Sequence, residues 1–199
     1  MAYWNPFLLF NLMAPWIMLC PSHAFPTGAP ASACENMLPI HTGTQPQQTP
    51  APYEFLVSTP YFLNGQPVNV QILGSAYRGL LLEARAFGST AALGFWQTPP
   101  NNTKLLQCSG NPQGAVTHSN TNLKTGQDSY TWLPPNSDCP SVVIFVATVA
   151  QSHDIYWTNV KSKVIWRNSK ATCGVESFTR SLSANAAIFS LLPILLGYI

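Results

Sequence analysis

The sequence predicts an all-β domain: a β-sandwich that is held by two disulfides and exported from the cell. Prolines and glycines, 18 and 12 in number, are spread along the 199 residues. This distribution argues against long helices and favours short strands joined by turns. Seven or eight candidate strands follow one another at about ten-residue spacing, as in a β-sandwich. Once an N-terminal signal is removed, the number of cysteines is even, which fits a disulfide-bonded domain.

The N-terminus has the features of a signal peptide that covers residues 1–24. Residues 7–19 form an apolar run too short to span a bilayer, and Ser22 and Ala24 place small side chains where signal peptidase cleaves. We expect cleavage after Ala24. A short N-terminal anchor is the alternative, because residues 1–5 contain no lysine or arginine. Residues 25–176 then form one domain, since this length suffices for a single core.

Cleavage removes Cys20 and leaves an even set of cysteines: Cys34, Cys108, Cys139 and Cys173. Four cysteines in an oxidising compartment imply two disulfides. A zinc site would require closely spaced pairs of the C-x-x-C kind, and the sequence has none among these four. We therefore expect two disulfides and no metal.

Strands are expected where apolar residues alternate with polar ones. Val68, Val70 and Ile72 share one face of a half-buried strand, and residues 80–86 alternate in the same way. Residues 142–147 are apolar on both faces and rich in β-branched side chains, which predicts the central strand of a covered sheet. Further strands are expected near residues 53–58, 93–97, 115–118, 128–132 and 155–160, with turns at residues 64–65, 99–101, 111–112 and 134–136.

The C-terminal tail, residues 177–199, has the features of a membrane signal. Residues 186–199 are apolar, but a helix of this length is shorter than the hydrocarbon core of a bilayer, and Pro193 would weaken it. Small residues, a polar stretch and an apolar end resemble a glycosylphosphatidylinositol signal, with Ser177 or Ser183 as attachment points. A single-pass helix from Leu182 and a buried C-terminal segment are the alternatives.

The chain contains no motif that predicts catalysis. It has no G-x-S-x-G elbow and no P-loop, its acidic residues are scattered, and the disulfides occupy the cysteines. His41, His118 and His153 are far apart in sequence, so ordinary hydrogen-bonding roles are expected for them. Glu83 and Arg85 lie two residues apart on one strand face and are expected to form a structural ion pair. A net charge of +2 is too small to predict a nucleic-acid partner. We expect a non-enzymatic protein without a cofactor.

Three surface features bear on recognition. Asn101 begins the only N-glycosylation sequon, in a segment whose prolines predict an exposed loop. Core packing is expected for most tryptophans, although a sugar-stacking platform is the alternative for Trp96, Trp132, Trp157 and Trp166. Five of the nine basic residues gather near the C-terminus: Lys161, Lys163, Arg167, Lys170 and Arg180. A solvated face beside a membrane, or contact with an anionic glycan or lipid, would explain this cluster.

Segments along nearly the whole expected domain resemble, in order, those of a reeler domain. They include residues 25–30, Ala33-Cys34, Pro52-Tyr53, Val68-Asn69-Val70, residues 79–85, Gly94-Phe95-Trp96, Leu106-Gln107-Cys108, residues 117–120, Trp132, Cys139, Ala147-Thr148 and Tyr156-Trp157. The resemblance implies an immunoglobulin-like β-sandwich. It also implies that Cys34 pairs with Cys108 and Cys139 with Cys173.

The resemblance extends to function. Reeler domains open reelin and F-spondin, head the ferric-chelate reductases, and stand alone in small secreted defence proteins of insects. We therefore expect a secreted or cell-surface recognition protein that acts in innate defence. An accessory domain related to ferric-chelate reductases and a matrix or adhesion module are the alternatives.

Overall fold

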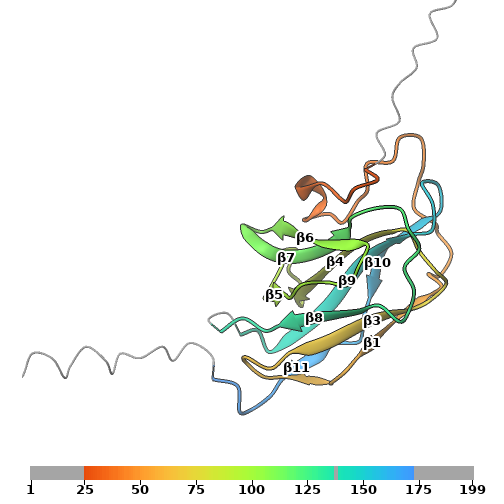
Figure 1. The fold of residues 1–199 in the computed structure, drawn as a ribbon. Helices are drawn as coiled ribbons and strands as arrows, with labels where there is room; N and C mark the ends of the chain where they lie inside the picture. The colour runs from red at the N-terminus through yellow and green to blue at the C-terminus, as the bar shows by residue number, and fades with distance from the viewer. Residues whose placement is uncertain (1–24, 137–138, 173–199) are drawn as a thin grey trace, which may run out of the picture.

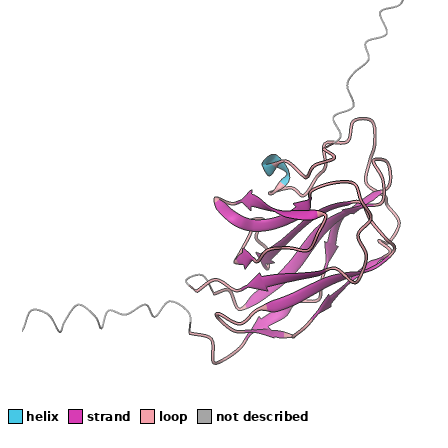
Figure 2. Cartoon of the chain, viewed as in Figure 1, coloured by secondary structure: helices cyan, strands magenta, loops and turns pink. Residues whose placement is uncertain are grey.

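The computed structural model describes residues 25–136 and 139–172, which fold into two β-sheets packed face to face (Figures 1 and 2). The only helical element of these residues is a single 3-10 turn, η1 (Ala31–Ala33). The predicted all-β, immunoglobulin-like sandwich is therefore confirmed.

The smaller sheet has four strands in the order β1-β3-β8-β5. They are β1 (Tyr53–Val57), β3 (Val68–Gly74), β8 (Ser129–Leu133) and β5 (Phe95–Trp96). The larger sheet has the order β2-β11-β9-β4-β7-β6, and β10 also pairs with β9. Its strands are β2 (Tyr61–Phe62), β4 (Gly79–Ala86), β6 (Thr103–Cys108), β7 (Asn111–His118), β9 (Val142–Ala150), β10 (Tyr156–Lys161) and β11 (Ile165–Arg167). The described pairings are antiparallel except that between β11 and β2.

The main core lies between the sheets and is rich in aromatic rings. The rings of Trp132 and Phe145 meet edge to face with centroids 5.5 Å apart, and Trp96 and Phe62 pack beside them. The valines and isoleucine of β3 face this core, while the residues between them face outward. The alternation predicted for Val68 to Ile72 is thus confirmed, because one face of the smaller sheet is exposed to solvent.

Strand β4 differs from its prediction. Its alternation was expected to leave one face in solvent, yet every residue from Leu80 to Arg85 is buried. The reason is a second, smaller core on the outer face of the larger sheet, where the N-terminal segment covers Leu81, Ala115 and Val146. In Figure 1 this segment, coloured red to orange, runs beside β6 and β7. Residues 25–41 are called the N-terminal strap from here on.

Strand β9 agrees with its prediction, whereas the turn before β7 does not. Residues 142–147 belong to β9, an interior strand paired with β4 on one side and with β10 and β11 on the other, as predicted. The prediction of a turn at Asn111-Pro112 is wrong. The chain reverses at Ser109 and Gly110, which both have positive φ angles, and Asn111 already pairs with Cys108 at the start of β7. Strands β2, β6 and β11 were not predicted.

No helix among the described residues is long and apolar enough to cross a membrane. The expected signal peptide (residues 1–24), the expected tail (residues 177–199) with Ser177 and Ser183, and the basic residue Arg180 lie outside the described residues.

Candidate functional site

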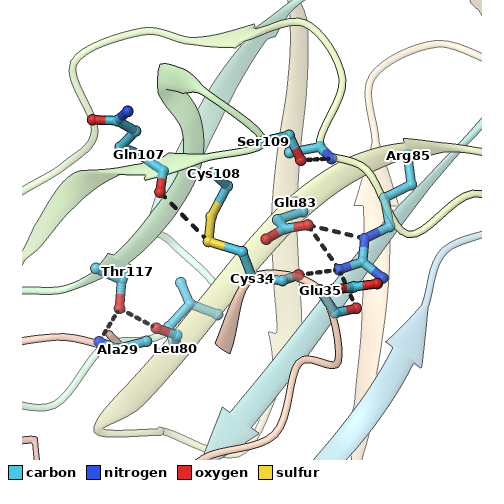
Figure 3. The surroundings of a disulfide bond; sticks show 11 residues. Ala29, Cys34, Glu35, Leu80, Glu83, Arg85, Gln107, Cys108, Ser109 and Thr117 are labelled. Carbon is cyan, nitrogen blue, oxygen red and sulfur yellow. Dashed lines mark hydrogen bonds and ion pairs between the residues drawn. A yellow bond between two sulfur atoms is a disulfide. The ribbon is translucent and has the colours of Figure 1, made fainter. Parts of the chain in front are cut away.

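A disulfide between Cys34 and Cys108 joins the N-terminal strap to the end of β6 (Figure 3). This is the first pair that the resemblance implies. Both cysteines are buried, and the Cys34 sulfur lies 3.5 Å from the carbonyl oxygen of Gln107. Cys139 is also disulfide-bonded. Cys173, its expected partner, lies outside the described residues, so that pairing stays a prediction.

Beside this disulfide lies the predicted ion pair of Glu83 and Arg85, both buried (Figure 3). Arg85 donates from Nε to Glu83 Oε2 over 2.9 Å. Its Nη2 also donates to the backbone carbonyls of Cys34 and Glu35 in the strap. The Glu83 Oε1 atom is buried without a hydrogen-bond partner among the described residues. Arg85 therefore ties the strap to β4, and Glu83 holds the guanidinium in place.

Burial raises the pKa of Glu83 to about 7, although Arg85 acts to lower it. Above its ordinary pKa of 4.5 the unfolded chain releases this proton, while the folded protein retains it until the pH approaches 7. Folding stability should therefore fall by about 3 kcal/mol as the pH rises from 4.5 through 7. Glu83→Gln, which cannot ionise, should lose this part of the slope. Urea unfolding of both proteins across that range measures the difference, and identical pH slopes would contradict the prediction.

Asn101 lies exposed in a tight turn before β6, and the Thr103 hydroxyl of its sequon donates to the Pro100 carbonyl. The expected loop is thus present. A glycan on Asn101 stays a prediction.

The four tryptophans do not form one platform. Trp96 and Trp132 are fully buried and Trp157 nearly so, which confirms core packing for these three. Trp166 is different: 51% of it is exposed, and it pairs in register with Tyr61 of β2, which is 55% exposed. Two aromatic side chains therefore stand next to each other on the outer strands of the larger sheet.

The basic cluster follows this same border of the sheet. Lys161 ends β10, Lys163 lies in the connection to β11, Arg167 ends β11, and Lys170 follows it; all four are exposed. We call these four residues, with Tyr61 and Trp166, the basic edge. The two ion pairs found among the described residues, Glu83 with Arg85 and Asp154 with His153, involve none of the four cations. Arg167 is instead held by a hydrogen bond from Nη1 to the Cys139 carbonyl, over 2.8 Å.

The fold brings together the three histidines that are far apart in sequence. His41, His118 and His153 all line one cavity of about 170 Å³ beneath the N-terminal strap. The rings of His41 and His153 stack with centroids 4.5 Å apart. Burial and the neighbouring His153 lower the pKa of His41, which favours the neutral ring. No pattern in the sequence indicates this convergence, because it depends on the strap crossing the sheet.

His118 has a structural role at this cavity, as expected. Its Nδ1 accepts the Leu80 backbone N–H over 3.2 Å, and its Nε2 lies 2.9 Å from the carbonyl of Phe25 in the strap. The neutral ring with its proton on Nε2 satisfies both contacts. Gly28 lets the strap come this close, because a Cβ there would lie 2.8 Å from the His118 carbonyl oxygen.

Together these features define a class of protein: a disulfide-bonded β-sandwich with a basic, partly aromatic border and a strap-covered cavity. The chain belongs to the reeler family, since the model of the reeler domain matches residues 32–172.

Two kinds of protein are found among the relatives of this chain. "Putative defense protein 3" of Antheraea mylitta is 36% identical over 72% of this chain and 87% of its own length. "Putative defense protein Hdd11" of Hyphantria cunea is 35% identical over 73% of this chain and 90% of its own. "Putative ferric-chelate reductase 1" of Danio rerio is 26% identical over 90% of this chain, but the match covers only 31% of that longer protein.

Among solved structures, the human F-spondin reeler domain has a TM-score of 0.51 at 18% identity, over 63% of this chain and 95% of the domain. This likeness supports the fold.

Proposed function

We propose that this protein is a non-enzymatic extracellular recognition protein of innate defence that binds an anionic glycan or lipid surface through its basic edge. Two findings support the proposal. The relatives matched over most of their length carry defence-protein names. The basic edge gathers four exposed cations that make no ion pair within the described residues, and this observation carries the proposal.

The chemistry of the basic edge suits an anionic surface. Four cations along one border produce a positive potential that attracts sulfate, phosphate or carboxylate groups. The side chains of Tyr61 and Trp166 add exposed aromatic faces, on which a sugar ring or the interfacial region of a membrane can pack. The hydrogen bond from Arg167 to Cys139 fixes one cation before any ligand arrives.

The tail would bring this edge to a membrane. Lys170 is close in sequence to Ser177 and Ser183, the expected attachment points, so a lipid anchor at either serine would hold the basic edge near anionic headgroups. Release of the protein from intact cells by phosphatidylinositol-specific phospholipase C would support this arrangement. Retention after that treatment would argue against it.

The basic edge predicts a large loss of binding when its charges are removed. The triple variant Lys161→Gln, Lys163→Gln, Lys170→Gln keeps Arg167 and its hydrogen bond to Cys139. It should bind sulfated glycan or vesicles rich in phosphatidylserine about 100-fold more weakly, since each lysine near an anionic surface contributes about 1 kcal/mol. Titration at fixed ionic strength measures the change.

Lys104→Gln provides the control, because Lys104 is an exposed cation on β6, away from the basic edge. It should bind nearly as the unaltered protein does. Equal affinities of the triple variant and the unaltered protein would overturn the proposed role of the basic edge.

The alternatives are an accessory role beside a ferric-chelate reductase and a matrix or adhesion role. A haem absorbance band in the purified protein would favour the first.

A further inference from the structure

The cavity beneath the N-terminal strap combines a mainly apolar lining with one arginine. It lies between the strap, the start of β4, the end of β9 and the loops that follow β7 and β9. Most of its lining is apolar and includes Phe25, Pro30, Met37, Leu80, Leu81 and Ala150. No acidic side chain from the described part of the chain lines it. A space of about 170 Å³ with such walls favours an apolar guest, since a similar cavity of about 150 Å³ holds one benzene molecule.

Among the described residues, Arg78 is the one arginine or lysine that lines this cavity. Its backbone is fixed on both sides, because its N–H donates to the Ala150 carbonyl and its carbonyl accepts the Lys124 ammonium. Its Nη1 donates to the Thr121 carbonyl over 2.8 Å. The described residues show no partner for the rest of its guanidinium, whose parallel N–H groups suit a carboxylate.

The charges around Arg78 favour an anion. The Lys124 ammonium is buried and donates to three backbone carbonyls, those of Arg78, Asn120 and Asn122. Asp128 lies near enough to Lys124 to oppose its charge in part. Asp154 is paired with His153 over 2.6 Å, so its charge is opposed as well.

The histidines add ring faces to this lining, and the acidic partner of His153 is Asp154. Both nitrogens of His118 have backbone partners. His41 and His153 stack with an angle of 22° between their rings, and the lowered pKa of His41 keeps that ring neutral at physiological pH. An alkyl chain can pack against the neutral ring of His41.

We propose that the strap cavity binds a small anionic amphiphile, a fatty acid of about eight carbons, with its carboxylate on Arg78 and its alkyl chain inside the cavity. The site shares no residue with the basic edge, so this proposal and the proposed function fail independently.

Chain length tests the cavity without any substitution. Isothermal titration with sodium salts of straight-chain fatty acids from four to twelve carbons should show affinity rising about fourfold for each added methylene. The rise should stop near eight carbons, where the cavity is full. Acetate and 1-octanol serve as controls, since the first lacks the chain and the second lacks the charge. Absence of saturable octanoate binding, or affinity that still rises at twelve carbons, would overturn the proposal.

Two variants then test the ligand's carboxylate and its alkyl chain separately. Arg78→Gln should weaken octanoate binding at least tenfold and leave 1-octanol binding unchanged. Ala150→Leu adds bulk to the cavity wall and should weaken both ligands, provided its thermal unfolding shows a folded protein. Glu54→Gln, which changes an exposed residue of β1 that does not line the cavity, should bind octanoate as the unaltered protein does. Octanoate binding that neither Arg78→Gln nor Ala150→Leu weakens would overturn the assignment.

Discussion

Arg85→Met should lower the free energy of unfolding by about 3–5 kcal/mol, the usual result of removing one partner from a buried ion pair. The substitution leaves Glu83 fully buried without its cation. It also removes the hydrogen bonds that Arg85 donates to the Cys34 and Glu35 carbonyls of the strap. Urea unfolding of both proteins at pH 8 measures the loss, because the pKa of about 7 leaves Glu83 of the unaltered protein mostly ionised at that pH.

A double variant separates the charge from the packing. Glu83→Leu combined with Arg85→Met replaces the ion pair by apolar side chains, and should recover about 2 kcal/mol relative to Arg85→Met alone. Lys104→Met, which changes an exposed cation of the same sheet, should alter stability by no more than about 0.5 kcal/mol. A double variant no more stable than Arg85→Met would show that the unpaired carboxylate is not the main cost.

The strands could be predicted where burial is decided locally. Val68, Val70 and Ile72 alternate because one face of β3 meets the core and the other meets solvent. Strand β9 is apolar on both faces because it is covered on both. The ion pair of Glu83 and Arg85 follows from the same period-two rule, which places residues two apart on one face.

Elements that depend on distant partners could not be predicted in this way. Strand β2 has two residues and exists because β11, more than 100 positions later, pairs with it. Burial of both faces of β4 depends on the strap, whose own sequence shows no strand or helix period. The cavity has the same cause, since His41, His118 and His153 meet only when the strap crosses the sheet. The cysteine pairing came from the resemblance, not from spacing.

The strap is therefore the element that turns an ordinary sandwich into one with a covered site. It is held by the disulfide to Cys108, by Arg85, by His118 at Phe25 and by the Thr148 hydroxyl, which donates to the Met37 carbonyl. The hydrogen bonds between the strap and the sheet can break and re-form when the strap opens locally. The disulfide is covalent, so it limits how far the strap can leave the sheet.

Removal of that disulfide by Cys34→Ala with Cys108→Ala should lower the free energy of unfolding by about 4 kcal/mol, because the bridge closes a loop with a sequence separation of 74 residues. It should also weaken octanoate binding, since the strap forms one wall of the cavity. The expected second bridge, between Cys139 and Cys173, closes a shorter loop and offers a matched control. Its removal by Cys139→Ala with Cys173→Ala should destabilise the fold by a similar amount. It should leave the octanoate affinity of the folded protein unchanged. Chemical unfolding and octanoate titration of both double variants measure these effects. Equal octanoate affinities in the two double variants would show that the strap holds its position over the cavity without the disulfide.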